Sequence, residues 1–202
     1  YAPRVSVRII VPHRGLAAAK TRLSPVLDDG EREALARRLL EQVLRIARET
    51  CDDVVVITPS EALAPLVLAA GAHLVVQLGL GLNAGLEQAR HEAIVDDVAT
   101  LLILHGDLPN LQTDDVAALL DALPAARGVA IAPDRAGSGT NGLALRPPNA
   151  IAFRFGVGSF EAHLAQAAEA GVPILEVHRP GLAFDLDTPA DLARWIELGD
   201  AA

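Results

Sequence analysis

A short apolar segment, Leu-Leu-Ile-Leu at positions 101–104, ends abruptly in a glycine and a carboxylate, Gly106 and Asp107. A run this short, closed by Gly and Pro, favours a parallel strand covered on both faces, because a surface strand alternates apolar and polar residues. In open α/β sheets, ligands bind at the carboxyl ends of the strands, where the strand order reverses. The segment therefore predicts a buried strand that carries Asp107 to a ligand-binding edge.

Strand-like segments alternate with helix-like segments along the chain. We expect strands at 5–11, 54–57, 73–77, the segment ending at Asp107, 128–132, 143–146 and 173–177. We expect helices at 31–49, 59–71, 84–95, 114–123, 160–170 and from 189 onward, with caps at Asp28 or Asp29, Asn83, Thr113 and Thr188. This alternation predicts βαβ units with right-handed crossovers and an α/β fold with a mostly parallel sheet. We expect residues 1–202 to form a single domain, because the length suits one core and the composition does not change along the chain.

Composition and charge exclude several classes of function. The net charge of -9 argues against a nucleic-acid binder, which normally carries a basic field. The apolar stretches are far shorter than the roughly 20 residues that cross a bilayer, and the single Cys51 fits a reducing compartment. We expect a soluble, cytoplasmic protein that contacts neither nucleic acid nor membrane. The sequence leaves the oligomeric state open, a homodimer included.

The loop after the first expected strand is basic, although the protein as a whole is acidic. It carries His13, Arg14, Lys20 and Arg22. Such a concentration of positive charge suits phosphate groups, which side chains and backbone N–H groups would hold together. The loop is neither a P-loop nor a Gly-x-Gly-x-x-Gly dinucleotide fingerprint. A solvated basic loop without a ligand is an equally good interpretation.

A second acidic cluster, Asp185 and Asp187, lies near the end of the chain. Their i, i+2 spacing places both side chains on one side of an extended segment. If the strand ending at Asp107 lies beside the first strand, Asp107 faces the same crevice as the basic loop. Carboxylates and phosphates share a crevice when a divalent cation such as Mg²⁺ lies between them. The hypothesis is that the acidic clusters meet at one metal ion; the alternative is an acidic turn followed by a helix cap.

Two polar loops, 137–141 and 156–159, offer backbone N–H groups and hydroxyls. The second loop opens an expected helix, whose N-terminus favours anions. Together the loops could hold a small phosphorylated acid, and ordinary connecting loops are the alternative. His105, beside Asp107, is interpreted as structural, and a general base at the strand end is the alternative.

Four segments, in this order along almost the whole chain, resemble a known family. They are Pro12 with 19–23 (Ala-Lys-Thr-Arg-Leu), 81–83 (Gly-Leu-Asn), 106–109 (Gly-Asp-Leu-Pro) and 185–189 (Asp-Leu-Asp-Thr-Pro). They resemble the 2-phospho-L-lactate or phosphoenolpyruvate guanylyltransferases of deazaflavin coenzyme F-420 biosynthesis. The last segment is shared with wider nucleotidyltransferases similar to the molybdenum-cofactor guanylyltransferase. This resemblance implies a Rossmann-like three-layer sandwich of the nucleotide-diphospho-sugar transferase type.

The resemblance also implies roles for individual residues. Mg²⁺ would be held by Asp107, Asp185 and Asp187. GTP would be bound by Pro12, Arg14, Lys20, Arg22, Asn83 and Asp107, of which Lys20, Arg22 and Asp107 would be catalytic. The phosphorylated acid would be bound by Thr140, Gly156 and Ser159. The chain departs from the family pattern at His13-Arg14 and at Asn141.

The implied reaction moves GMP from GTP to the phosphate of a small carboxylic acid and releases pyrophosphate. The acid is phosphoenolpyruvate, 2-phospho-L-lactate or 3-phosphoglycerate. Two alternatives stay open: a metal-dependent nucleotide-sugar glycosyltransferase and a domain that binds GTP without turning it over. Because the lone Asp107 is followed by Leu-Pro, and because the basic loop suits a triphosphate, the nucleotidyltransferase is favoured.

Overall fold

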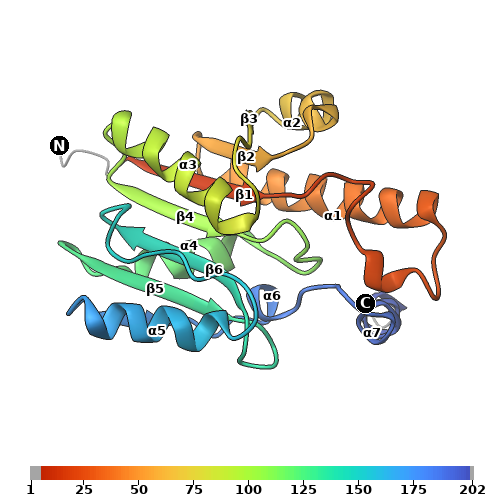
Figure 1. The fold of residues 1–202 in the computed structure, drawn as a ribbon. Helices are drawn as coiled ribbons and strands as arrows, with labels where there is room; N and C mark the ends of the chain where they lie inside the picture. The colour runs from red at the N-terminus through yellow and green to blue at the C-terminus, as the bar shows by residue number, and fades with distance from the viewer. Residues whose placement is uncertain (1–5, 201–202) are drawn as a thin grey trace.

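The computed structural model describes residues 6–200, so Val5 of the first expected strand lies outside the described part of the chain. Within it, one sheet has the order β3-β2-β1-β4-β6-β5-β7 (Figure 1). Its strands are β1 Val7–Pro12, β2 Val54–Thr58, β3 His73–Val76, β4 Thr100–Leu104, β5 Gly128–Pro133, β6 Thr140–Arg146 and β7 Ile174–Glu176. Neighbours run parallel except β6, which is antiparallel to both β4 and β5. The predicted α/β fold with a mostly parallel sheet is confirmed.

The order of the strands reverses between β1 and β4. The chain runs from β1 outward to β2 and β3, then returns to place β4 on the other side of β1, with Ile9 opposite Leu102. All five residues of β4 are buried, as expected for a strand covered on both faces. The carboxyl ends of β1 and β4 therefore lie side by side, and the loops that follow them open at one edge of the sheet.

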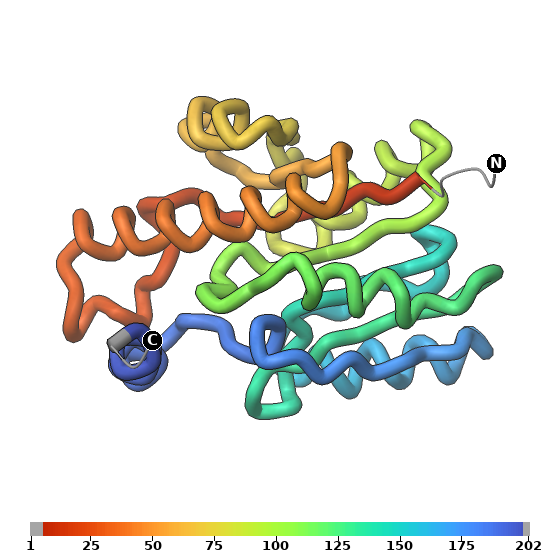
Figure 2. Tube along the Cα trace, turned by 180° about the vertical axis from the view of Figure 1, so that it is seen from behind, coloured from red at the N-terminus to blue at the C-terminus, as the bar shows by residue number. Residues whose placement is uncertain are grey.

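Helices cover both faces of the sheet, which completes the three layers (Figures 1 and 2). On one face lie α1 Asp29–Thr50, α2 Ala64–Ala69, α4 Thr113–Asp121 and α6 Pro180–Ala183; on the other lie α3 Leu82–Val95 and α5 Ser159–Glu169. Short 3₁₀ turns, Thr21–Leu23 and Glu61–Leu63, precede α1 and α2. None of the helices in the described residues is long and apolar enough to cross a membrane.

The last helix, α7 Pro189–Asp200, lies outside these layers and beside the beginning of α1 (Figure 2). A small apolar cluster joins them, in which Leu23, Leu39 and Leu186 are buried and Trp195 is partly buried. This packing holds the segment before α7, which includes Asp185 and Asp187, against the loop after β1.

Two of the predicted helix caps are correct. Asp28 caps α1 by accepting a hydrogen bond from the backbone N–H of Glu31, whose side chain accepts from the Asp28 N–H. Thr188 caps α7, since its hydroxyl accepts from the backbone N–H of Asp191. Both follow the capping-box pattern, which a sequence reveals directly.

The other caps and several strand ends were predicted wrongly; in particular, β4 ends at Leu104, so Asp107 lies three residues beyond the strand that was expected to end with it. Gly81, with a φ of 88°, precedes α3, so Asn83 lies inside the first turn rather than at the cap. Gln112, not Thr113, caps α4: its backbone N–H donates to the side chain of Asp115 at 3.0 Å, and its carbonyl oxygen accepts from the Asp115 N–H. β6 begins at Thr140 rather than at residue 143, since the pairing with β5 extends back to Thr140, at the end of the expected polar loop 137–141.

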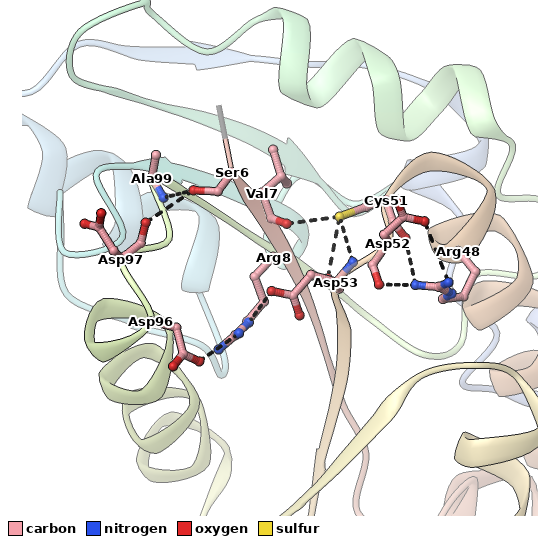
Figure 3. Close-up of polar contacts among 10 residues, drawn as sticks. All are labelled: Ser6, Val7, Arg8, Arg48, Cys51, Asp52, Asp53, Asp96, Asp97 and Ala99. Carbon is pink, nitrogen blue, oxygen red and sulfur yellow. Dashed lines mark hydrogen bonds and ion pairs between the residues drawn. The ribbon is translucent and has the colours of Figure 1, made fainter. Parts of the chain in front are cut away.

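At the amino-terminal edge of the sheet, a polar cluster around Arg8 connects β1 to the residue before β2 and to the end of α3 (Figure 3). Its guanidinium donates to Asp53 before β2 (Nε to Oδ2, 2.8 Å) and to Asp96 after α3 (Nη2 to Oδ2, 2.9 Å). The Sγ of Cys51 donates to the carbonyl oxygen of Val7 at 3.0 Å, which links the end of α1 to the same strand. This cluster fixes β1 at the edge opposite the expected ligand site.

We expect Arg8→Met to lower the free energy of unfolding by about 1 kcal/mol, because it leaves two carboxylates without their shared donor. Urea denaturation measures the change. Arg37→Met is the matched control, because the Arg37–Glu41 pair is long, at 3.9 Å, and solvent-exposed. Equal losses in the two variants would contradict a structural role for the Arg8 cluster.

Candidate active site

A polar cavity of about 450 Å³ lies at the carboxyl ends of β1 and β4. It is lined by residues from the loop after β1, the segment after β4 and the segment before α7. Among them are six predicted site residues: Pro12, Arg14, Lys20, Arg22, Asp107 and Asp187. The fold therefore brings together residues from both ends of the sequence, as the acidic and basic segments predicted.

Lys20 lies at the centre of this group. Its Nζ donates to Asp107 Oδ2 at 2.7 Å and to Asp187 Oδ1 at 2.9 Å, and its side chain is only 5% exposed. The backbone of Lys20 is left-handed, with a φ of 54°, which is uncommon for a residue other than glycine. This conformation directs the ammonium group between the two carboxylates instead of toward solvent.

The carboxyl groups differ in their pKa values. Burial would raise the pKa of Asp107, but the positive charge and hydrogen bond of Lys20 outweigh it, so the pKa is lowered. Burial, and then the negative charge of Asp107, raise the pKa of Asp185. Among the described residues, the buried Oδ1 of Asp107 has no hydrogen-bond partner. A cation close to this atom would satisfy it and relieve the repulsion between the acids.

The arginines and the histidine of the basic loop take different positions. The Arg22 side chain is 74% exposed, and its Nη1 lies 3.7 Å from Asp187 Oδ2. Arg14 is exposed at the cavity. His13 does not add positive charge as its place in the basic loop suggested: burial lowers its pKa to about 4, and its Nδ1 accepts from the Gly15 N–H. The loop thus presents three cations at neutral pH.

The acids do not enclose a metal ion by themselves. In the part of the chain that the structure describes, no three acidic, histidine or cysteine side chains are grouped closely enough to do so. Asp185 is held instead by Asn141, whose Nδ2 lies 3.3 Å from its Oδ1 and also donates to the carbonyl oxygen of Leu182 at 2.9 Å. Asn141 therefore positions one of the predicted metal ligands.

The residues predicted to bind the acid lie together but outside the lining of this cavity. Thr140 at the start of β6 and Ser159 at the start of α5 are buried, with the Ser159 hydroxyl donating to Thr140 Oγ1 at 3.3 Å. Gly156 precedes Ser159 with a φ of 136°, and a Cβ built there would meet nothing within 4 Å. His163 in α5 is completely buried beside them, and the sequence interpretation missed it.

Asn83 is not directed into the cavity as a ligand for a nucleoside. Its side-chain amide is bonded to the backbone of Phe155, donating to the carbonyl oxygen at 2.9 Å and accepting from the N–H at 3.0 Å. The neighbouring residues Gly81 and Leu82, together with Gln77, line the cavity instead. Asn83 thus joins the start of α3 to the segment before α5.

The burial of His163 makes stability depend on pH. Burial lowers the pKa of His163 to about 4, so between pH 6.5 and 4 the unfolded chain binds a proton that the folded chain does not. Stability must therefore decrease as the pH falls through this window. We expect a loss on the order of 2 kcal/mol between pH 7 and pH 5 from this residue. Urea denaturation at both pH values, compared with His163→Asn, measures it; an identical pH dependence in the variant would contradict it.

A larger groove of about 690 Å³ lies between α1 and α2. Its walls are apolar residues of α2 and charged residues of α1, among which Arg37 pairs with Glu41 and Arg45 with Glu49. The residues that line this groove include no lysine, and its two acids pair with arginines on the same helix, so the polar cavity with its buried Lys20 is the candidate active site.

Solved structures identify the class of fold. The chain is similar to a putative nucleotide-diphospho-sugar transferase from Desulfovibrio desulfuricans, with a TM-score of 0.78, 19% identity and coverage of 96% of this chain and 87% of the other. It is also similar to a nucleotidyl transferase from Methanothermobacter, with a TM-score of 0.68, 16% identity and coverage of 96% and 97%. The fold is that of the nucleotidyltransferases and nucleotide-diphospho-sugar transferases.

Sequence comparison defines the family. A family model described as guanylyl transferase CofC like matches residues 7–201, and the chain belongs to this family. It is 45% identical to a phosphoenolpyruvate guanylyltransferase of Sphaerobacter thermophilus (91% of this chain, 89% of the relative) and 43% identical to one of Rubrobacter xylanophilus (94% and 93%). A 3-phospho-D-glycerate guanylyltransferase of Colwellia psychrerythraea is 31% identical (91% and 88%). The predicted family is confirmed.

Proposed function

We propose that this protein transfers the guanylyl group of GTP to the phosphate of phosphoenolpyruvate and releases pyrophosphate. The observation that carries the proposal is the Lys20 ammonium group between Asp107 and Asp187, in a cavity that Arg14 and Arg22 also reach. Membership of the guanylyltransferase family supports the same reaction and argues against both a glycosyltransferase and a domain without catalytic activity.

The reaction needs positioning and charge neutralisation rather than a protein nucleophile. An oxygen of the acceptor phosphate attacks the α-phosphorus of GTP in line. A new P–O bond forms as the bond from the α-phosphorus to the bridging oxygen breaks, and pyrophosphate leaves with the electron pair. The acceptor oxygen is already ionised at neutral pH, so no general base is required. Lys20 and Arg22 stabilise the charge that develops on the phosphates. Binding GTP and the acid side by side in fixed orientations lowers the entropic cost of the reaction.

Mg²⁺ fits the same cavity as a proposed cofactor. Asp107 and Asp187, which line the cavity, together with Asp185, which Asn141 contacts, would hold it. The unpartnered Asp107 Oδ1 is the carboxylate oxygen best suited to bind a cation. Mg²⁺ sites commonly combine one or two carboxylates with substrate phosphates. The three acids of this protein need not enclose the ion by themselves, because the phosphates of GTP would complete the site. When bound, Mg²⁺ would supply charge neutralisation between the carboxylates and the triphosphate.

The phosphorylated acid is proposed to bind near Thr140, Gly156 and Ser159. The open space beside Gly156 leaves its backbone accessible to a ligand. The N-terminus of α5, which begins at Ser159, favours an anion there. This placement would let the acceptor phosphate approach the nucleotide from the β6 side of the cavity.

Phosphoenolpyruvate is proposed as the acceptor because the relatives named for it are 43% and 45% identical, against 31% for the one named for 3-phospho-D-glycerate. The test is pyrophosphate release with GTP and Mg²⁺, with phosphoenolpyruvate, 2-phospho-L-lactate and 3-phosphoglycerate added separately. ATP and CTP in place of GTP are the controls. We expect the largest kcat/KM with phosphoenolpyruvate and GTP. Preference for another acid would overturn the acceptor, and release without any acid would overturn the reaction.

The compartment and the pathway belong to the proposal as well. We propose that the enzyme acts in the cytoplasm and, by its resemblance, in the biosynthesis of coenzyme F-420. Recovery of the native protein in the soluble fraction of the cell tests the compartment. Accumulation of the acceptor when the enzyme is removed tests the pathway.

A further inference from the structure

The buried His163 is bonded on both sides of its ring. Its Nε2 accepts a hydrogen bond from the backbone N–H of Arg154 at 3.0 Å, and its Nδ1 lies 3.1 Å from Thr140 Oγ1. The ring of Phe155 packs against it edge to face, with centroids 4.8 Å apart. These contacts fix the position and the orientation of the imidazole.

The contact with Arg154 determines which nitrogen carries the proton. A backbone N–H can only donate, so Nε2 must be the unprotonated nitrogen. A neutral imidazole then carries its proton on Nδ1, and burial keeps the ring neutral by lowering the pKa of His163 to about 4. Nδ1–H therefore donates to the Thr140 hydroxyl.

The Thr140 hydroxyl consequently accepts two hydrogen bonds, one from His163 and one from Ser159. A hydroxyl has two lone pairs and one proton, so both of its acceptor positions are used. Its own O–H is left to donate to a third partner. An anion is the partner that such a donor binds best, because hydrogen bonds to charged acceptors are stronger than those between neutral groups.

We propose that His163 is a positioning residue for the phosphorylated acid, because it holds the Thr140 hydroxyl as a hydrogen-bond donor toward the bound anion. This inference rests on the proposed function, which places the acid at Thr140 and Ser159. His163 acts through Thr140 and touches no reacting atom. Without the Nδ1–H donor, the Thr140 proton can turn away from the acid, for example toward Ser159, and the acid loses a fixed donor.

Two substitutions separate the two contacts of the ring. In His163→Asn the amide N–H group falls near the position of Nδ1 and can still donate to Thr140. In His163→Gln the longer side chain reaches the position of Nε2, so it can keep the contact with Arg154 but not the one with Thr140. Thermal unfolding of both variants shows whether each has folded.

Kinetics of pyrophosphate release then test the proposal. We expect His163→Gln to raise the KM for phosphoenolpyruvate about tenfold with little change in the KM for GTP, and His163→Asn to recover most of the loss. In a Thr140→Val background, His163→Gln should have no further effect on the KM for the acid. An equal rise in both KM values, or an undiminished effect in the Thr140→Val background, would overturn the proposal.

A measurement without substrates keeps this inference distinct from the proposed function. The ¹⁵N chemical shifts of the wild-type His163 ring report its tautomer, and we expect protonation at Nδ1. Protonation at Nε2 would overturn the positioning role even if the wild-type enzyme is active. Failure of the wild-type enzyme to release pyrophosphate with any phosphorylated acid would instead overturn the proposed function, while the tautomer would still decide the His163–Thr140 contact.

Discussion

We expect Asp107→Asn to lower kcat/KM for guanylyl transfer by about three orders of magnitude, because a residue that contacts Lys20 and is proposed to hold the cation becomes neutral. The amide has nearly the same shape as the carboxylate, so we expect the sheet and the backbone contact from the Leu186 N–H to the Asp107 carbonyl oxygen, at 3.2 Å, to remain. Steady-state pyrophosphate release at saturating Mg²⁺ measures the change.

The control for this substitution is Asp114→Asn, which removes an equal charge from the exposed first turn of α4. Its activity should match the wild type. If Asp107→Asn retained more than about a tenth of the wild-type kcat/KM, a loss of under 1.4 kcal/mol, the account of the site would be wrong.

Lys20→Met should abolish most of the activity, with kcat/KM falling by at least a hundredfold. The buried ammonium group neutralises Asp107 and Asp187 in the free protein and is the proposed ligand of the triphosphate once a cation binds the acids. Lys20→Arg should not restore wild-type activity, since a planar guanidinium cannot replace a compact charge between two carboxylates.

Arg22→Gln measures the contribution of the exposed cation, for comparison with the buried Lys20. The Arg22 side chain is largely solvated and its contact with Asp187 is long, so its removal should cost about tenfold in kcat/KM, less than the loss from Lys20→Met. Both variants are assayed for pyrophosphate release at fixed ionic strength. A larger effect from Arg22 than from Lys20 would contradict the central position of Lys20.

The sequence was sufficient to place Asp107. An apolar run that ends in a glycine and an acid has few alternatives to a buried strand, and β4 is such a strand. The meeting of Asp107 with the basic loop also followed from the fold class, because the carboxyl ends of parallel strands open at one edge. The i, i+2 spacing of Asp185 and Asp187 suggested a second part of the site but left an acidic turn with a helix cap as the alternative, and the family motifs favoured the site.

Contacts between residues far apart in the sequence could not be predicted in the same way. Lys20 contacts Asp107 from a left-handed backbone conformation, and no local pattern indicates such a conformation at a lysine. Asn83 is a residue type common at helix caps. Its side chain instead forms two hydrogen bonds with the backbone of Phe155, which only the tertiary structure brings close to it. The antiparallel direction of β6 depends likewise on hydrogen bonds across the sheet.

His163 was missed although the sequence carried a signal. It lies four residues after Ser159, and because α5 begins at Ser159 the two residues share a face of this helix. A histidine one turn from a predicted anion-binding serine is a candidate for contact with that site. The apolar residues around it, however, are equally typical of an ordinary core position.

The central claim is that the cavity at the ends of β1 and β4 joins GMP to the phosphate of a small acid. Phosphorus NMR of a reaction containing the protein, GTP, Mg²⁺ and phosphoenolpyruvate tests it most directly. We expect two mutually coupled signals from a new phosphoanhydride, one phosphorus from GMP and one from the acid, together with free pyrophosphate. Formation of GDP and inorganic phosphate, or an unchanged GTP spectrum, would contradict it.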